Sequence, residues 1–240
     1  MSSEDTQPLD LNATELSATP QGASQDAYFK IIQRMHKALK GAGRQESDAS
    51  LTAVSKNQNW DVIEPVLKAG QRSFGENRVQ EALGRWTSVR PDYADLELRL
   101  IGPLQSNKVA EAVAFFDVIE SLDRDKIARL VAEEIQTQGR HPRLYIQVNI
   151  GEEPQKSGVL PHEADAFLKT VTQTYGLKLD GLMCIPPVEG PRGPYFALLS
   201  QIASHHGLKG LSMGMSDDFE TALAFGSTEI RVGSAIFGAR

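Results

Sequence analysis

Short apolar runs alternate with amphipathic helical patterns along most of this 240-residue chain. A surface helix places apolar residues three or four positions apart, whereas a buried strand is a short apolar run bounded by turn residues. The runs that satisfy the strand pattern recur through the chain and end close to its last residue. We predict strands near residues 51–55, 72–75, 97–102, 117–120, 144–150, 178–185, 209–213 and 229–233.

This repeated order of strand and helix is typical of βα units around a parallel sheet. The clearest helices are predicted before Gly139 and before Gly176, where apolar residues keep the helical period and a glycine ends it. Eight strands favour a closed (β/α)8 barrel, an α/β fold of about 250 residues. A doubly wound open sheet would give similar local patterns, so it remains the alternative fold.

One further helix is predicted before the first strand, over residues 26–40. After the last strand only a short segment remains, so we expect this N-terminal helix to complete the outer ring of the barrel. Pro65 disfavours the interior of the helix that precedes Gly70, and we expect that helix to start late. Residues 1–25 are predicted to be a disordered tail and residues 26–240 one barrel domain. The apolar face of the first helix consists of Tyr28, Ile31, Ile32, Met35 and Leu39.

Composition narrows the classes of partner and compartment. The formal charge of -6 and the lack of a Lys/Arg cluster disfavour nucleic acid as a partner. No apolar run approaches the roughly 20 residues that span a bilayer, so no membrane partner is predicted. Residues 1–25 hold no Lys or Arg, unlike a signal or transit peptide. One cysteine, Cys184, excludes an internal disulfide framework and fits a reducing cytoplasm.

The ends of the predicted strands carry the candidate chemistry, because barrel enzymes keep their sites at the carboxyl ends of the strands. Lys56 ends the first strand, and its amine could form an imine with a carbonyl compound. Lys156 is the rival lysine, but its place in a loop predicted to be flexible argues against a fixed imine. Asn77 follows the second strand as a possible ligand, although the strand-end position alone favours a cap of the next helix.

The loops after the last two strands suggest a phosphate site, which barrels commonly build at this position. Ser216 stands at a helix start, where Asp217 and Glu220 could form a capping-box-like pair. Gly233 and Ser234 join the last strand to a short helical turn, which would present amides and a hydroxyl to an anion. Ordinary capping explains either loop alone. The coincidence of both loops favours a phosphorylated ligand.

Arg231 lies within the last predicted strand, where a buried guanidinium requires acceptors for its hydrogen bonds. Glu229 or Asp218 could pair with it, and a ring nitrogen of a ligand is the alternative acceptor. Cys184 is interpreted as a small buried residue without a redox role.

The ordered motifs AVSK56, FGEN77RVQEA, IGPLQSNK108, IQVNIGEEPQKSG158, GLMCIP186, LSMGMS216DD and RVGSAIFG238 resemble the pyridoxal phosphate homeostasis proteins, the YggS/PROSC family. The resemblance covers about residues 28–240. It implies a barrel like that of alanine racemases and pyridoxal 5'-phosphate (PLP) as cofactor. It implies these roles: Lys56 as the Schiff-base lysine, Asn77 as the motif asparagine, Ser216, Gly233 and Ser234 at the phosphate, and Arg231 at the pyridine nitrogen.

Two positions depart from the family pattern. Ser234 replaces the usual threonine and keeps its hydroxyl, while Pro103 stands where many members have histidine, so that histidine's role does not transfer. The resemblance implies PLP and amino-acid homeostasis without catalytic turnover, and it assigns neither a catalytic residue nor a metal ligand. A PLP-dependent amino-acid racemase is the alternative function, and a sugar-phosphate barrel enzyme is the alternative without PLP. Protein partners stay unidentified.

Overall fold

The structure is a computed structural model that describes residues 20–238. Its parallel strands form a closed barrel in the order β1 to β8, so the predicted (β/α)8 fold is confirmed. β8 pairs with β1 to close the barrel, with Arg231 opposite Thr52. The strands are β1 (Ser50–Val54), β2 (Ser73–Glu76), β3 (Glu97–Leu100), β4 (Val118–Leu122), β5 (Arg143–Val148), β6 (Gly181–Cys184), β7 (Gly210–Ser212) and β8 (Glu229–Val232).

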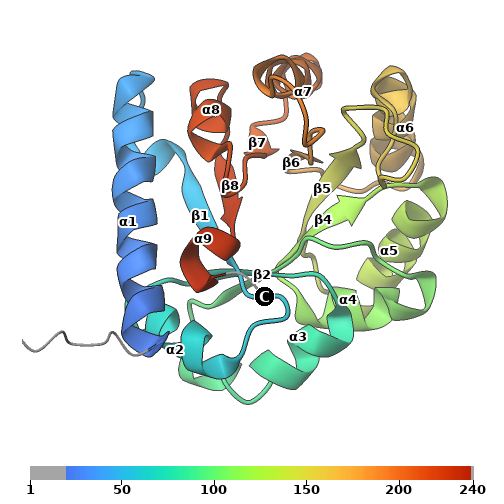
Figure 1. Cartoon of the computed structure of the whole chain (residues 1–240). Helices are drawn as coiled ribbons and strands as arrows, with labels where there is room; N and C mark the ends of the chain where they lie inside the picture. Colours follow the sequence, from blue (N-terminus) through green and yellow to red (C-terminus); the bar gives the residue numbers. More distant parts are fainter. Residues whose placement is uncertain (1–19, 239–240) are drawn as a thin grey trace, which may run out of the picture.

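Helices alternate with these strands and surround the barrel (Figure 1). They are α1 (Pro20–Gly41), α2 (Trp60–Lys68), α3 (Val79–Trp86), α4 (Val109–Phe115), α5 (Asp125–Gln138), α6 (Ala164–Lys169), α7 (Gly193–His205), α8 (Phe219–Ala224) and α9 (Ser234–Phe237). Short 3₁₀ turns cover Glu46–Asp48, Arg90–Asp92, Ser106–Lys108 and Pro161–Glu163, and a π-helical turn, Thr170–Thr174, continues α6. Among residues 20–238 there is no helix long and apolar enough to cross a bilayer.

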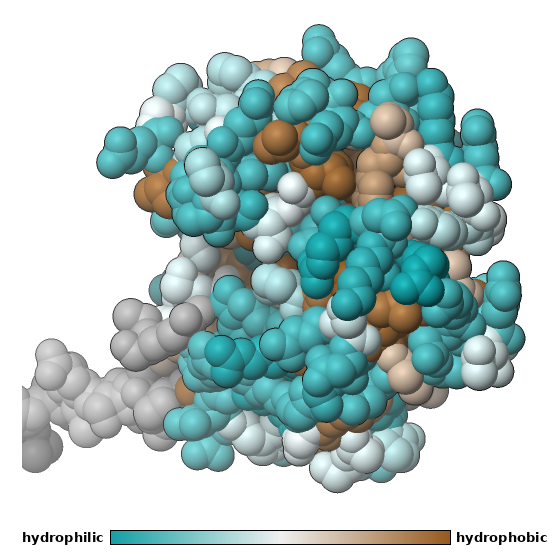
Figure 2. All heavy atoms as spheres, turned by 90° about the vertical axis from the view of Figure 1, so that its right-hand side faces the viewer, coloured by the Kyte–Doolittle hydropathy of each residue, from teal (hydrophilic) through white to brown (hydrophobic). Residues whose placement is uncertain are grey.

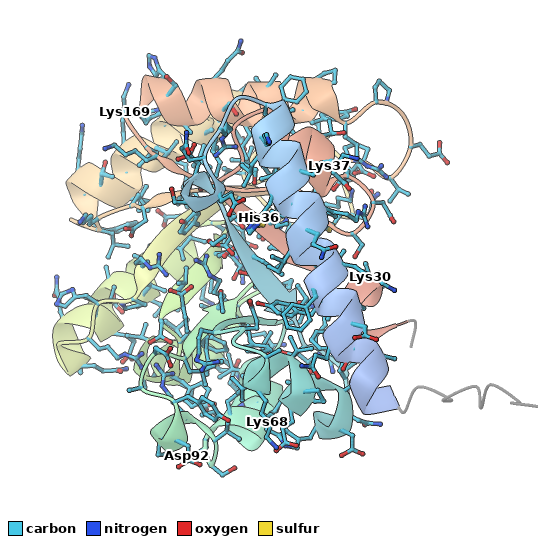
Figure 3. The ribbon with its side chains drawn as sticks, turned by 90° about the vertical axis from the view of Figure 1, so that its left-hand side faces the viewer. Lys30, His36, Lys37, Lys68, Asp92 and Lys169 are labelled. Carbon is cyan, nitrogen blue, oxygen red and sulfur yellow. The ribbon has the colours of Figure 1, made fainter. Side chains whose placement is uncertain are left out.

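Helix α1 completes the outer ring, as predicted. It packs against α2, α8 and α9, and fills the place that a long helix after β8 would take. Its apolar side is buried at Ile31, Met35 and Leu39, whereas Lys30 and Lys37 lie along its outer side (Figure 3). The helical period of its apolar residues therefore predicts which side of α1 covers the barrel.

Two boundaries differ from the predictions. Helix α1 begins at Pro20, where a proline is well tolerated, so residues 20–25 are helical and not part of a tail. The rest of the predicted tail, residues 1–19, lies outside the described residues. Helix α2 starts at Trp60 and contains Pro65, so the predicted late start is wrong. Burial of Ile63, Val66 and Leu67 stabilises this helix despite the hydrogen bond that Pro65 cannot donate.

The interior of the barrel contains charged residues beneath the carboxyl ends of the strands. Arg99 is 3% exposed and forms ion pairs with Glu97, Glu120 and Glu229 at 2.7–2.8 Å. These carboxylates compensate the burial of the guanidinium. Mainly hydrophilic residues also cover the outer side of the molecule that carries α5 and α6 (Figure 2).

Candidate functional site

A cavity of about 690 Å³ opens at the carboxyl ends of the strands, and we call it the rim cavity. Its volume lies within the range of roughly 300–1,000 Å³ that is usual for small-molecule sites. The structure brings all six predicted binding residues to its wall. They are Lys56, Asn77, Ser216, Arg231, Gly233 and Ser234.

The loop that carries Lys56 is held on both sides of the lysine. The Ser55 hydroxyl donates to Glu76 Oε1 at 2.7 Å. The Asn57 amide donates to Glu81 Oε1 at 2.5 Å, and Arg85 Nη2 donates to the Gln58 carbonyl at 2.9 Å. These contacts fix the backbone immediately before and after Lys56.

Three residues make these contacts, Glu76 at the end of β2 and Glu81 and Arg85 on α3, and we call them the Lys56 clamp. Arg85 joins them, because its guanidinium pairs with Glu76 at 2.5 Å and with Glu81 at 3.1 Å. Glu76 is fully buried, and burial raises its pKa, whereas Arg85 opposes that rise. Its Oε1 also accepts a bond from the Trp86 indole, while its Oε2 is buried without a hydrogen-bond partner.

The clamp also stabilises an unusual backbone conformation beside the lysine. Asn57 has a φ of 57°, in the left-handed region that few residues except glycine and asparagine adopt readily. Its amide is the group that Glu81 binds. The sequence analysis did not identify the clamp. The signal that could have pointed to it is a charged residue, Glu76, within a strand pattern that is otherwise apolar or small.

Asn77 lies beside this loop and is not a helix cap. Helix α3 has Arg78 at its N-cap position and no capping hydrogen bond from a side chain, so the capping explanation is wrong. The backbone of Asn77 is packed closely against Gly102, where an added Cβ would lie 2.3 Å from the Asn77 carbonyl oxygen. The chain can therefore pass Asn77 only with glycine at position 102.

The loops after β7 and β8 place two hydroxyls side by side, and we call Ser216 and Ser234 the serine pair. Their oxygens are 3.2 Å apart. Gly233 joins Ser234 to β8. An added Cβ at Gly233 would lie 3.2 Å from the Val54 carbonyl oxygen, which is tighter than ordinary contact. Because β8 pairs with β1, Ser234 and Lys56 come from neighbouring strands, and Ser216 follows β7 on the other side of β8.

A buried aspartate organises the turn before Ser216. Asp218 is 5% exposed, accepts the Met215 amide at 2.6 Å and pairs with Arg192 at 3.1 Å. Burial raises the pKa of Asp218, and the bond from Met215 opposes this rise. The predicted capping pair of Asp217 and Glu220 is wrong, since Asp218 is the N-cap of α8 and Glu220 pairs with Arg34 of α1.

Arg231 is 4% exposed, and its side chain reaches the rim cavity from within β8. Its Nη1 donates to the Ser212 hydroxyl at 2.7 Å, and its Nη2 donates to the Cys184 carbonyl at 2.8 Å. Neither predicted protein partner is used, because Glu229 pairs with Arg99 and Asp218 pairs with Arg192. Two neutral acceptors thus fix the guanidinium and leave its charge unpaired by either carboxylate.

Lys156 also lines the rim cavity, and its loop is more constrained than the sequence suggested. The Asn149 side chain donates to the carbonyls of Glu153 and Lys156, and Gln147 donates to the Ser157 carbonyl. Loop flexibility is therefore no argument against Lys156. Its ammonium, however, donates to the Pro186 carbonyl at 2.9 Å and pairs with Glu153, so two protein groups already bind it.

Three remaining residues have limited roles. Lys108 pairs with Glu111 at 3.0 Å and is not among the residues that line the rim cavity. Pro103 lines the cavity, where its ring offers no hydrogen-bonding nitrogen. Burial raises the pKa of the Cys184 thiol to about 12, which keeps it protonated and unreactive.

Comparisons with known proteins show the family. The family "Alanine racemase, N-terminal domain" matches residues 31–240. The pyridoxal phosphate homeostasis protein of Pseudomonas aeruginosa is 39% identical over 219 residues, covering 88% of this chain and 93% of that protein. The Escherichia coli protein of the same name is 37% identical over 220 residues, covering 88% of this chain and 94% of that protein.

A solved structure adds a ligand to the comparison. PipY of Synechococcus elongatus with PLP bound is 35% identical and has a TM-score of 0.74. The match covers 86% of this chain and 100% of that chain.

Proposed function

We propose that this chain, which belongs to the family of pyridoxal phosphate homeostasis proteins, binds PLP as a Schiff base on Lys56. When bound, PLP supplies an aldehyde carbon that forms reversible imines and a pyridine ring that withdraws electrons. One observation carries the proposal: a lysine at the end of β1 and the serine pair, which follows β7 and β8, line the same cavity.

The residues of the rim cavity fit the shape of PLP. Its aldehyde and phosphate arms are attached to adjacent ring carbons, and Lys56 and the serine pair follow consecutive strands of the barrel, β1 and β8 with β7. Its ring nitrogen lies opposite the aldehyde. Arg231 lies within β8, whereas Ser234 follows the end of that strand. The guanidinium therefore comes from deeper in the barrel than the serine pair does. The donors therefore occur in the order that the ligand requires.

Each residue then has a defined task. Lys56 holds the aldehyde, and the clamp keeps its backbone in place. The hydroxyls of Ser216 and Ser234, with amides near Gly233, donate to the phosphate oxygens. Arg231 directs a permanently charged donor at the ring nitrogen and so disfavours a proton there. Asn77 contributes a side-chain amide to the cavity wall.

We further propose that the chain holds PLP without efficient turnover. Racemisation needs two positioned acid/base groups, one on each face of the substrate. Lys56 could serve one face. None of the five tyrosines, which all fall within residues 20–238, lines the rim cavity. Arg231 also makes the ring a poorer electron acceptor, because it keeps the nitrogen unprotonated.

Two measurements separate the candidate functions. A visible absorbance band in the purified full chain, lost on borohydride treatment, would support PLP over a sugar phosphate. With saturating PLP, L-alanine in deuterated water should exchange its α-proton slowly and yield little D-alanine. Turnover in the usual enzyme range of roughly 1–1,000 per second would instead establish the racemase.

A cytoplasmic location, predicted from the single Cys184, stays a prediction that cell fractionation can test.

A further inference from the structure

A second group of chemically reactive side chains lies outside the rim cavity. Asp165 in α6 meets His205, the last residue of α7, and His206, which follows it. One ligand atom from each of the three residues lies within 4.8 Å of the others. The sequence analysis assigned no metal ligand, because Asp165 is far from the two histidines in the chain. Only the packing of α6 and α7 brings them together.

The distances among these atoms suit a small cation. The Nε2 atom of His206 lies 3.2 Å from Asp165 Oδ1, and the Nε2 atom of His205 lies 3.9 Å from the same oxygen. Ligands of a tetrahedral zinc ion at about 2.0–2.2 Å from the metal lie about 3.3 Å apart. His206 already meets this spacing. His205 exposes 75% of its side chain, so a small side-chain rotation can bring it closer.

Lys169 orients the carboxylate of Asp165. Lys169 donates to Oδ2 of Asp165 at 2.8 Å, which leaves Oδ1 directed at the imidazoles. The Lys169 ammonium repels a second cation, but it is exposed and bound to the other oxygen, where solvent screens its charge.

Two features of the surroundings favour a cation as well. His205 and His206 lie at the carboxyl end of the 13-residue helix α7, and that end of a helix carries partial negative charge. A hollow of about 250 Å³ adjoins the three residues, with Pro161, Leu198 and Ile202 in its wall. This hollow leaves room for water on the open side of an ion.

We propose that Asp165, His205 and His206 form a binding site for a divalent transition-metal ion. Two imidazoles and one carboxylate are ligands of borderline hardness, which suit Zn²⁺, Ni²⁺ or Cu²⁺ and disfavour Ca²⁺ and Mg²⁺. The site does not depend on PLP, because the residues that line this hollow and those that line the rim cavity do not overlap.

The test is a Zn²⁺ titration of the full chain without a polyhistidine tag, using competition with a coloured chelator. We expect one ion per chain. His206→Ala and His205→Ala should each lower the affinity for Zn²⁺ about tenfold or more, because even the loss of a residue that only orients a ligand lowers metal affinity by that factor. Cys184 should not compete, because its thiol is buried and protonated. Thermal unfolding of each variant establishes that it is folded.

His36→Ala is the matched control. His36 also pairs with one carboxylate, Glu46, at 3.3 Å, and it lies on α1, well apart from Lys169 in Figure 3. We expect this variant to bind Zn²⁺ like the unaltered chain. Absence of saturable binding would overturn the proposal, and so would equal affinity in the unaltered chain and in either of the two site variants.

Discussion

The two sides of the rim cavity are built from different interactions. On the Lys56 side, a fully buried Glu76 and the Arg85 guanidinium hold the loop through charged hydrogen bonds. On the side of the serine pair, two neutral hydroxyls lie beside the cavity, and Asp218 shapes the turn that carries Ser216. The first side depends on a few strong contacts, and the second on several weaker ones.

This difference matches the two tasks of the site. A covalent bond requires one nitrogen at one position, and a loop held at three points provides that. A phosphate accepts hydrogen bonds through three oxygens, so several donors can share its binding. We therefore expect single substitutions on the Lys56 side to affect the whole fold and those on the serine side to affect PLP affinity alone.

The largest expected effect is that of Arg85→Met. It keeps the volume of the side chain but leaves the buried Glu76 carboxylate without its ionic partner. Breaking a buried ion pair in this way costs about 3–5 kcal/mol in the free energy of unfolding. Urea denaturation near neutral pH measures this loss directly.

The pH dependence of that loss identifies its cause. Burial raises the pKa of Glu76 in the folded state, and the missing Arg85 would raise it further. A raised folded pKa means that the contribution to stability is greatest below the unfolded value and declines as pH rises through the folded pKa. The deficit of Arg85→Met should therefore shrink in acid. Arg72→Met is the control, because Arg72 pairs with the exposed Asp95. A loss in the free energy of unfolding of similar size in Arg72→Met would contradict the special role of the clamp.

These two sides also differ in how far the sequence predicted them. The strands and α1 followed from apolar periodicity, and the six cavity residues followed from the ends of strands and from motifs. The clamp was missed, because a charged residue can pair with partners that only the tertiary packing selects. Arg231 shows the same limit: the sequence indicated that it needs acceptors but could not show that they are Ser212 and Cys184.

The next effect in size concerns the serine pair. Loss of a hydrogen bond to a charged group costs about 1.5–3 kcal/mol, so Ser234→Ala should weaken PLP binding about tenfold or more. Ser216→Ala should act similarly, with the free energy of unfolding nearly unchanged in both. Ser234→Thr is the matched control that keeps the hydroxyl. PLP affinity that stays the same in both alanine variants would exclude the serine pair as a phosphate site.

The smallest effect is expected at Cys184, beneath both sides. Its pKa is about 12 because of burial, so an alkylating reagent should modify the folded chain very slowly near neutral pH. By linkage, the buried neutral thiol contributes stability that is complete below about pH 9 and is lost as pH rises toward 12. Mass spectrometry of the alkylated chain, with and without urea, checks this. Rapid labelling without urea would contradict this, because it would show that reagent reaches the buried thiol in the folded chain.

The most direct test of the account is to locate the PLP adduct. The full chain is loaded with PLP, reduced with borohydride and digested, and peptide mass spectrometry identifies the modified lysine. We expect the adduct on the peptide that contains Lys56. The adduct should be absent from this peptide in Lys56→Ala and present in Lys156→Ala. An adduct found mainly on Lys156 or Lys108 in the unaltered chain would contradict the assignment of Lys56 as the residue that holds PLP.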